Sequence, residues 1–406
     1  MKALAPLLLL ASLTFSFAED WPQWMGPHRD GHIAKASWPD KLEGHLKQLW
    51  RVDLAPSYST PIVVGSRVFT TETRDKSHEV VRAFDRATGK ELWKAEWEGA
   101  MSVPFFAKSN GDWIRSSPAC DGERLYVAGM RDLLVCLEVA TGREVWRVDF
   151  VKALNAKEPD FGFVCSPLID GEHVFVQAGG GLAKLDKGSG KIIWRVLDDG
   201  GGMMGSAFSS PVIAKLAGKR QLVALTRTKL AGVDPGDGKV LWEQPVEAFR
   251  GMNILTPVIF GDAVFTAAYG GRSQLFGIEK NGERFRAVER WKYKGQGYMS
   301  TPVVVADHVW LHQRSQRVVG LNLRDGAERW VSEKSFGKYW SQVAGGDKIL
   351  ALDERGQLIL LRANPEKFEV LDEKKIADKD TWAHLAVSGR DVFIRELRAL
   401  TVWRWE

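Results

Sequence analysis

Short runs of alternating apolar and polar residues, separated by turn residues, fill most of the chain. Ser-Pro or Thr-Pro pairs precede many of these runs and recur at intervals of 57, 49, 44, 46 and 45 residues. A turn such as Asp121-Gly122 and a second β-rich run follow the first apolar segment. This order of signals predicts two antiparallel strands in every repeat. The pairs are Thr60-Pro61, Ser117-Pro118, Ser166-Pro167, Ser210-Pro211, Thr256-Pro257 and Thr301-Pro302.

A second landmark closes each repeat with a turn and a tryptophan. In residues 83–93 an alternating strand runs into an aspartate, a Thr-Gly turn and a strand that carries Trp93. The same frame returns ahead of Trp146, Trp194, Trp242 and Trp330, and in stretched form ahead of Trp291. An aspartate can bond turn amides, glycine adopts φ > 0, and tryptophan offers a large flat surface to the neighbouring repeat. Each repeat is therefore expected to hold four short strands.

Repeats of about 45 residues with four strands are typical of β-propeller blades, which stack around an axis. Six blades carry both landmarks, a degenerate seventh opens at Trp340, and an eighth opens at Trp382 but supplies only three strands. The missing strand matches residues 48–54, which contain Trp50 and precede the first Thr-Pro pair. The sequence predicts an all-β, eight-bladed propeller whose N- and C-terminal strands pair, with a seven-bladed ring as the alternative.

The strands of the last two blades carry weaker signals. They are expected near residues 348–353, 357–362 and 368–371 in the seventh blade, and at 385–387, 392–396 and 399–405 in the eighth. In the seventh blade Phe368 is expected to replace the tryptophan.

Composition and the N-terminal residues indicate an exported globular protein. The chain has 56 Lys and Arg against 51 Asp and Glu, which argues against a nucleic-acid partner, and it is 45% hydrophobic. Residues 1–18 resemble a cleaved signal peptide, so residues 19–47 would form a leader, residues 48–406 the propeller, and the protein would be periplasmic or secreted. No cysteine stands at the cleavage site and no later apolar run reaches about 18 residues. Neither a lipid anchor nor a membrane span is therefore expected.

Three cysteines, Cys120, Cys136 and Cys165, cannot all pair within one chain. They have neither a CxxC spacing nor a nearby histidine, so burial as small hydrophobic residues is the favoured interpretation, although the sequence leaves their pairing open.

The frame in residues 83–93 resembles the tryptophan-docking repeat of the bacterial quinoprotein, or PQQ-like, propellers, and the resemblance covers residues 48–406. In that family the tryptophan of one blade packs against the next. The resemblance therefore implies a docking role for Trp50, Trp93, Trp146, Trp194, Trp242, Trp291 and Trp330. The leader at residues 21–27 is similar to a segment that precedes such propellers, and it is expected to cover apolar surface on one face.

The resemblance leaves more than one function open. Quinoprotein alcohol dehydrogenases bind pyrroloquinoline quinone with calcium, but this chain lacks their adjacent cysteine pair and has little length beyond its blades. BamB-like periplasmic propellers are non-catalytic, although they are lipoproteins and this chain has no lipobox cysteine. We therefore expect a secreted or periplasmic, non-catalytic scaffold that binds a protein or ligand, with no catalytic residue and no cofactor. A dehydrogenase for alcohols or sugars that uses pyrroloquinoline quinone, and a propeller that recognises carbohydrate or another extracellular polymer, are the alternatives.

Two kinds of motif in the sequence lack the surrounding structure that their usual function requires. Residues 200–205 fit GxGxxG, but a strand and not a helix follows them, so no nucleotide site is expected. His308 and His312 have helical ligand spacing within a predicted hairpin, and a glycine interrupts the pair formed by His28 and His32. No metal site is therefore expected.

Long connections between blades point to the working surface. They exceed the roughly 2 to 6 residues that a corner needs, and they emerge on one face around the channel mouth. They could simply plug the channel, or they could form a binding surface, because Tyr, Trp and Arg in a concavity are common anchors. The residues expected to ring this mouth are Tyr58, Arg115, Asn253, Tyr298, Trp340 and Trp382.

Overall fold

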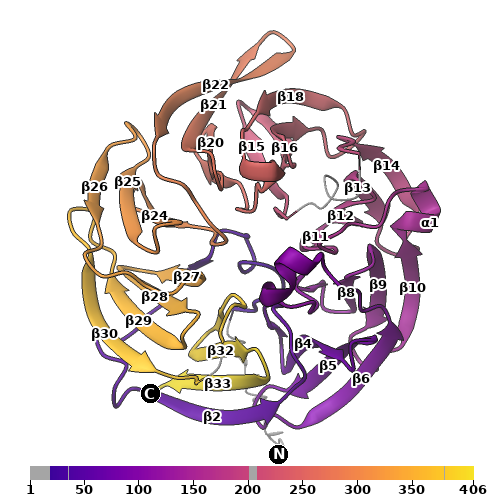
Figure 1. Ribbon diagram of the computed structural model, residues 1–406, viewed down its shortest axis with the longest axis vertical. Coiled ribbons are helices and arrows are strands. Elements are labelled where there is room, and N and C mark those ends of the chain that lie inside the picture. Colours follow the sequence, from indigo (N-terminus) through magenta and orange to yellow (C-terminus); the bar gives the residue numbers. More distant parts are fainter. Residues whose placement is uncertain (1–18, 35, 201–207, 379) are drawn as a thin grey trace, which may run out of the picture.

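The structure is a computed structural model that describes residues 19–34, 36–200, 208–378 and 380–406. The predicted signal peptide at residues 1–18 lies outside the described residues, as do residues 201–205 of the GxGxxG match. The described strands form eight sheets arranged as a closed ring (Figure 1). Seven sheets have four antiparallel strands, and the eighth has four antiparallel strands with a short fifth strand added in parallel at its inner edge. The predicted all-β, eight-bladed propeller is confirmed.

Each of the first four blades takes its strands in chain order from the channel outwards. Blade 1 holds β3 (Ile62–Val64), β4 (Arg67–Arg74), β5 (His78–Asp85) and β6 (Glu91–Glu98). Blade 2 holds β7 (Ala119–Cys120), β8 (Arg124–Gly129), β9 (Leu133–Glu138) and β10 (Glu144–Asp149). Blade 3 holds β11 (Leu168–Asp170), β12 (His173–Ala178), β13 (Gly181–Asp186) and β14 (Ile192–Val196). Blade 4 holds β15 (Val212–Leu216), β16 (Lys219–Leu225), β17 (Lys229–Val233) and β18 (Val240–Pro245).

The last four blades complete the ring. Blade 5 holds β19 (Val258–Phe260), β20 (Ala263–Ala267), β21 (Ser273–Asn281) and β22 (Arg284–Tyr293). Blade 6 holds β23 (Val303–Val305), β24 (His308–His312), β25 (Val318–Asn322) and β26 (Glu328–Val331). Blade 7 holds β27 (Trp340–Gly345), β28 (Lys348–Asp353), β29 (Gln357–Arg362) and β30 (Glu369–Lys375). Blade 8 holds β31 (Ala386–Ser388), β32 (Asp391–Glu396), β33 (Ala399–Trp405) and β2 (Leu46–Asp53). The helical turns described are η1 (Phe105–Asn110), α1 (Phe150–Leu154) and η2 (Phe249–Gly251).

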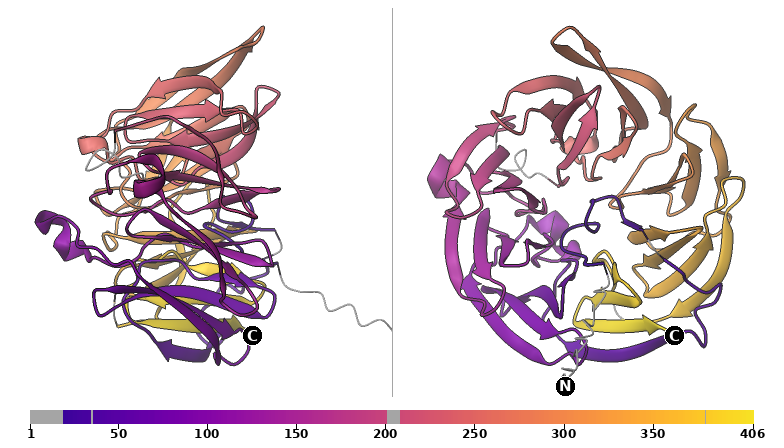
Figure 2. Two further views of the ribbon diagram at one scale, coloured as in Figure 1. Left: turned by 90° about the vertical axis from the view of Figure 1, so that its right-hand side faces the viewer. Right: turned by 180° about the vertical axis from the view of Figure 1, so that it is seen from behind.

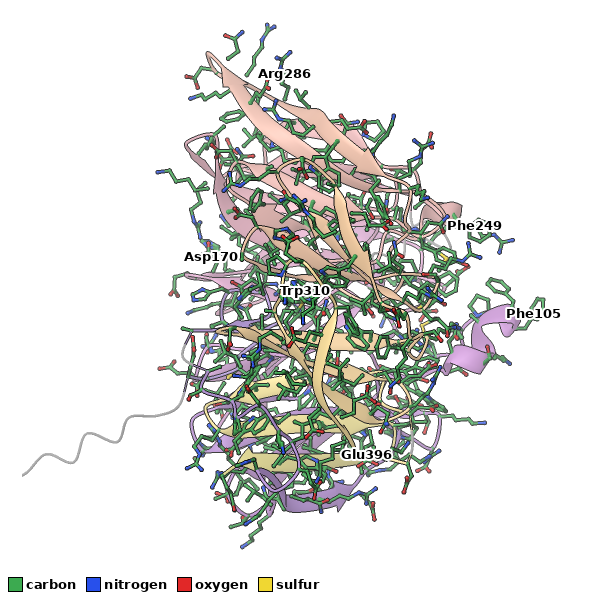
Figure 3. All side chains as sticks on the ribbon, turned by 90° about the vertical axis from the view of Figure 1, so that its left-hand side faces the viewer. Phe105, Asp170, Phe249, Arg286, Trp310 and Glu396 are labelled. Atoms are coloured by element: carbon green, nitrogen blue, oxygen red, sulfur yellow. The ribbon has the colours of Figure 1, made fainter. Side chains whose placement is uncertain are left out.

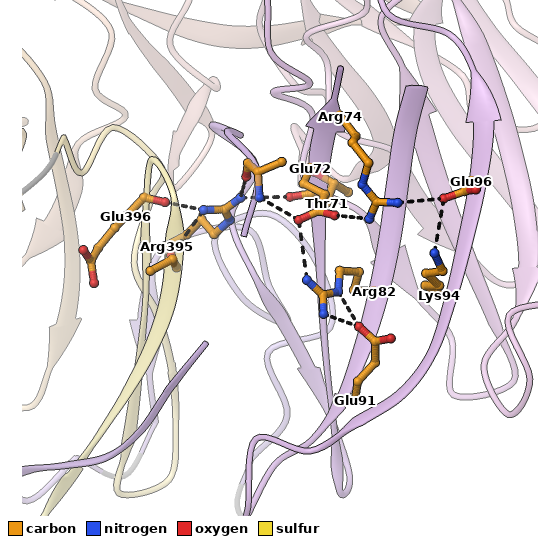
Figure 4. A network of polar contacts seen from close by, with 11 residues as sticks. Thr71, Glu72, Arg74, Arg82, Glu91, Lys94, Glu96, Arg395 and Glu396 are labelled. Carbon is orange, nitrogen blue, oxygen red and sulfur yellow. Dashed lines mark hydrogen bonds and ion pairs between the residues drawn. The ribbon is translucent and has the colours of Figure 1, made fainter. Parts of the chain in front are cut away.

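The ring closes through the two ends of the chain. Strand β2 pairs antiparallel with β33, from Leu46 opposite Trp405 to Asp53 opposite Ala399, so the seven-bladed alternative is wrong. Across the seam to blade 1, the Arg395 guanidinium donates to the carbonyl oxygen of Ala55 at 2.6 Å. The Glu72 carboxylate accepts from the Ala55 amide at 2.8 Å and belongs to a network of ion pairs on blade 1 (Figure 4). Pairing the ends removes an exposed sheet edge.

Five of the seven predicted docking tryptophans, Trp50, Trp93, Trp146, Trp194 and Trp291, lie on the following blade as the repeat implies. Each indole nitrogen donates to a carbonyl oxygen of the next blade's turn, at 2.9 to 3.3 Å. Each ring also covers the glycine of that turn, where a Cβ atom would lie within 2.9 Å of it. The turn glycine is therefore needed for space as well as for its positive φ.

Trp242 and Trp330 depart from this pattern. The Trp242 indole donates to Gln221 of its own blade at 2.7 Å, because the elongated β21–β22 hairpin carries the turn at Gly282 away and leaves nothing within 4 Å of that glycine. Blade 7 has no Thr-Gly turn, and Trp330 packs against Trp310 and Phe368 at centroid distances of 4.5 and 5.4 Å.

Phe368 does not take the tryptophan position of blade 7, contrary to expectation. The strand register places Asp372 opposite Leu360 just before the bulge, where the other blades carry tryptophan. The Asp372 carboxylate accepts from the amides of Leu42 and Glu43 at 2.7 and 3.1 Å. In blade 8 the last two strands, β33 and β2, come from opposite ends of the chain, so no turn connects them. The backbone amides of the leader take the place of that turn.

The Ser-Pro and Thr-Pro pairs form a hydrogen-bonded ring around the channel. The backbone amides of Thr60, Ser117 and Ser166 each donate to the hydroxyl of the corresponding residue in the next blade, at 2.9 to 3.1 Å. The serine before the pair contributes a second bond, since the Ser300 hydroxyl donates to the carbonyl oxygen of Trp340 at 2.6 Å. These motifs therefore join neighbouring blades through hydrogen bonds.

The leader crosses the central channel behind the blades, where Figure 2 shows it spanning the ring on the face opposite η1. Trp21 exchanges two backbone bonds with Val63 at 2.9 Å, the Cys120 amide donates to Pro22, and β1 (His32–Ile33) pairs in parallel with β27. The contacts reach blades 1, 2 and 7, so the leader closes one end of the channel. Cys120, Cys136 and Cys165 are buried and unpaired.

Candidate functional site

A cavity of 410 Å³ opens at the end of the channel that the leader does not close. Its walls come from the connections that join the last strand of one blade to the first strand of the next. These connections emerge on the face of η1 and η2, where Phe105 and Phe249 project in Figure 3, while Asp170 lies on the opposite side. The volume falls within the range of ordinary ligand pockets, roughly 300 to 1,000 Å³.

The structure brings five of the six sequence-predicted residues into this cavity. Tyr58, Arg115, Tyr298, Trp340 and Trp382 all line it, although they come from five different blades. Their common position at the start of an innermost strand explains this convergence, because those strand ends surround the channel.

Asn253 is a correction to the predicted set. Its side chain is buried and its amide nitrogen donates to the carbonyl oxygens of Thr226, Arg227 and Val246 at 3.1 to 3.4 Å. The residue therefore anchors its own connection to the β16–β17 turn and does not line the cavity.

Aromatic side chains form a continuous arc along one wall. Tyr58 stacks on Trp382 with ring centroids 4.6 Å apart, and Trp382 stacks on Tyr339 at 3.8 Å. The arc continues from Tyr339 to Tyr298 at 5.9 Å and from Tyr298 to Tyr269 at 5.3 Å. Such contacts fix the rings against one another, so the wall is preorganised and keeps its apolar surface towards the cavity.

A second group of aromatic residues faces this arc. Phe106 packs against Phe161 with centroids 6.2 Å apart, and Phe161 packs against Phe208 at 5.8 Å. Three of the long connections between blades supply these rings. Sequence reasoning missed the individual residues because only positions next to a strand start were selected. Tyr269 had no signal, since it lies in the β20–β21 turn and not in a connection between blades.

The leader forms the floor of the cavity through Trp24. Its indole nitrogen donates to the Thr256 hydroxyl at 2.9 Å, and its ring meets His384 edge-on at 5.1 Å. Nearby, the buried Arg29 guanidinium donates to the carbonyl oxygens of Ser166 and Pro167 at 3.0 and 2.7 Å. The segment expected to cover apolar surface thus closes the channel and shapes the site from below.

Positive charge accompanies the aromatic walls. Arg115, Arg227 and Arg250 line the cavity, and none of the described lining residues is acidic. Arg115 donates to the carbonyl oxygens of Gly111 and Trp113 at 2.8 and 3.2 Å, and burial lowers its pKa. Burial also raises the pKa of Tyr58 to about 12, so this phenol stays neutral near pH 7.

A protein-family model described as outer membrane protein assembly factor BamB matches residues 77–332, the part of the chain that carries most of the docking repeats. The chain belongs to the BamB family. The BamB of Yersinia pestis is 21% identical over 357 residues, which cover 86% of this chain and 84% of that protein. The BamB of Moranella endobia is 22% identical over 327 residues, covering 78% and 77%.

Solved structures share the fold. The crystal structure of BamB from Moraxella catarrhalis superimposes with a TM-score of 0.66 at 16% identity, covering 89% of this chain and 98% of that one. Quinohemoprotein alcohol dehydrogenase from Comamonas testosteroni gives a TM-score of 0.63 at 13% identity, covering 95% and 80%. At these identities the two solved structures show a shared fold and nothing beyond it.

The cavity of this BamB family member does not fit a calcium-assisted quinone site. Calcium takes oxygen ligands, chiefly carboxylates, and the described lining residues include no aspartate or glutamate. Among the described residues, no group of three or more His, Cys, Asp or Glu side chains could hold a metal ion. No helix in the described part of the chain is long and apolar enough to cross a membrane.

Proposed function

We propose that this protein is a periplasmic, non-catalytic scaffold that binds a partner at the aromatic cavity. The observation that carries the proposal is the cavity itself, with aromatic walls from several blades and a floor formed by the leader. Its relatives are named outer membrane protein assembly factors, and residues 1–18 have the pattern of an export signal. A role in the assembly of envelope proteins agrees with both.

The chemistry of the lining supports binding better than catalysis. The described residues that line the cavity include no acidic group and no cysteine that could act as a base or nucleophile. His384 is buried, its Nδ1 is bonded to the carbonyl of Leu385, and burial lowers its pKa to about 4. The imidazole is therefore neutral near pH 7, and one of its nitrogens is already engaged.

Recognition of carbohydrate receives less support from the same residues. Sugar hydroxyls need several free polar partners, whereas the hydroxyls of Ser166, Ser300 and Thr256 already bond to other blades or to the leader. The walls offer mostly apolar ring surface, which suits an apolar or aromatic group of a partner.

Site-specific photo-crosslinking in the periplasm tests the proposal. A photoreactive benzoylphenylalanine replaces Phe105 at the mouth, and in a matched strain it replaces Ile193 on outer strand β14, which is 46% exposed. We expect a discrete cross-linked partner from position 105 and none from position 193. Equal products from both positions would contradict a working surface at the mouth.

The purified protein provides a second readout. We expect 1-anilinonaphthalene-8-sulfonate, an anionic dye with apolar aromatic rings, to bind with one-to-one stoichiometry. Trp382→Ala should weaken dye binding about tenfold because the stacked centre of the aromatic wall is lost. Ile193→Ala should leave dye binding unchanged. Failure of both the cross-link and the dye would refute the proposed binding role.

A further inference from the structure

Exposed phenylalanines extend the apolar surface of the cavity onto the rim. Phe105 and Phe106 of η1 are 85% and 48% exposed, and Phe249 of η2 is 50% exposed. Figure 3 shows Phe105 and Phe249 projecting from the same face. The Arg250 guanidinium lies over Phe106 at 5.9 Å and over Phe249 at 5.2 Å, so the rim is continuous between blades 1 and 4. Exposed apolar rings gathered on one face in this way mark an interaction site.

The combination of cavity and rim limits the shape of the occupant. A cavity of 410 Å³ admits a small ligand or one or two large side chains, but not a folded domain. Phe105 stands outside the lining and is almost fully exposed, beyond the reach of a molecule that the cavity encloses. An occupant that covers both surfaces must be extended, with one group inserted and the flanking chain lying on the rim. An unfolded polypeptide segment meets this requirement.

Charge limits the chemistry of that segment. Among the described residues, Arg115 and Arg250 form no ion pair with a carboxylate. Asp112, which acts on Arg115 electrostatically, does not line the cavity. Two further cations lie over the aromatic arc, with Arg314 at 4.8 Å from the centroid of Tyr269 and Lys338 at 5.4 Å from that of Tyr339. A partner with carboxylates would supply the missing counter-ions and form charge-assisted hydrogen bonds.

We propose that the mouth binds an extended polypeptide segment in which an aromatic side chain is flanked by acidic residues. The aromatic group enters between the Tyr58–Trp382–Tyr339 stack and the phenylalanines, and the carboxylates pair with Arg115 and Arg250. This inference rests on the proposed binding role of the cavity and names the class of its partner. An oligonucleotide also combines rings with anions, but it needs cations along a track of phosphates, whereas these arginines surround one cavity.

Calorimetry with three blocked peptides tests the inference on the full mature chain. The acidic aromatic peptide is Gly-Asp-Glu-Phe-Asp-Glu-Gly, its amide counterpart is Gly-Asn-Gln-Phe-Asn-Gln-Gly, and its ring-free counterpart is Gly-Asp-Glu-Ala-Asp-Glu-Gly. We expect the acidic aromatic peptide to bind at least about tenfold more tightly than either counterpart, with an affinity that falls as salt rises. An oligothymidylate of similar length should bind more weakly than the acidic aromatic peptide.

Charge reversal supplies the matched variants. Arg250→Glu should weaken binding of the acidic aromatic peptide at least about tenfold and should leave the amide peptide unchanged. Arg284→Glu makes the same change in charge at the exposed tip of the β21–β22 hairpin, which projects away from the mouth in Figure 1. Arg284→Glu should change the affinity for neither the acidic aromatic peptide nor the amide peptide. Arg250 is exposed, so its replacement is expected to leave the fold intact.

Several outcomes would overturn the inference. Equal affinity for the acidic and amide peptides would show that the carboxylates are not recognised. An equal loss of affinity in Arg250→Glu and Arg284→Glu would show that only the net charge of the protein matters. Tighter binding of oligothymidylate would assign the mouth to another class of partner. If no peptide binds while the dye and the cross-link at position 105 succeed, the partner class is wrong but the proposed scaffold function stands.

Discussion

Gly142 tests whether the contact between a tryptophan and the next blade's turn stabilises the ring. This glycine has φ +72° in the Thr-Gly turn of blade 2, and a Cβ atom added there would lie 2.4 Å from the Trp93 ring. The indole of Trp93 is held in place by its hydrogen bond to the carbonyl of Val139 at 2.9 Å. The substitution Gly142→Ala therefore meets both backbone strain and a steric conflict.

A matched glycine separates the two costs. Gly282 occupies the corresponding turn of blade 5 with φ +60°, but nothing lies within 4 Å of an added Cβ atom. Gly282→Ala should lower the free energy of unfolding by the left-handed backbone strain alone, about 1 to 2 kcal/mol. Gly142→Ala adds an overpacking cost of about 1 to 3 kcal/mol and should total about 2 to 5 kcal/mol.

Urea denaturation, followed in parallel by circular dichroism and tryptophan fluorescence, measures both changes and checks whether unfolding is two-state. The cost of Gly142→Ala should fall to that of Gly282→Ala in a Trp93→Ala background, because the steric conflict is then gone. Equal costs for the two glycine variants in the wild-type background would refute the reasoning. So would a Gly142→Ala cost that Trp93→Ala leaves unchanged.

Three further measurements follow from the structure. Removing residues 399–406 deletes β33 and leaves β2 without its pairing partner, so the melting temperature of the whole ring should fall. An unchanged melting temperature would contradict closure through the chain ends. Trp340 is only 3% exposed and stacks on His312, so Trp340→Ala should lower stability by about 3 to 5 kcal/mol, while the partly exposed Trp382→Ala should cost less and mainly weaken dye binding. The folded-state pKa of His384, about 4, lies below its ordinary value of 6.5, so the unfolded chain binds the extra proton and stability is lost as pH falls from 6.5 towards 4. The cost of His384→Leu should therefore shrink by about 2 kcal/mol between about pH 7.5 and pH 5, and a constant cost would contradict a neutral buried imidazole.

The alternative function, a dehydrogenase that uses pyrroloquinoline quinone, can also be tested directly. Pyrroloquinoline quinone with calcium, alcohols or sugars and an artificial electron acceptor should give no calcium-dependent turnover, because the described cavity lining supplies no carboxylate ligand. Saturable quenching of tryptophan fluorescence accompanied by turnover would contradict the scaffold proposal.

The amino-acid sequence by itself determined the blades and the way the ring closes. Alternation with a period of two, a positive-φ glycine and a hydrogen-bonding aspartate act within a few residues, so the strands and turns are readable locally. Closure followed from counting, since the eighth blade lacked one strand and residues 48–54 had the pattern of that strand. Position at a strand start also predicted five of the residues that line one opening, namely Tyr58, Arg115, Tyr298, Trp340 and Trp382.

Only the tertiary structure decided which side chains meet across blades. Asn253 has the same position at a strand start, but its side-chain amide donates hydrogen bonds to backbone carbonyls of Thr226 and Val246. Asp372 and not Phe368 occupies the tryptophan position, because the bulge of blade 7 sets the register. The leader's path across the end of the channel puts Trp24 under the cavity. That path and the stacking of Tyr339 on Trp382 both depend on contacts between residues far apart in sequence. Such contacts depend on the positions of the blades and the leader relative to one another in space, which no local pattern of residues encodes.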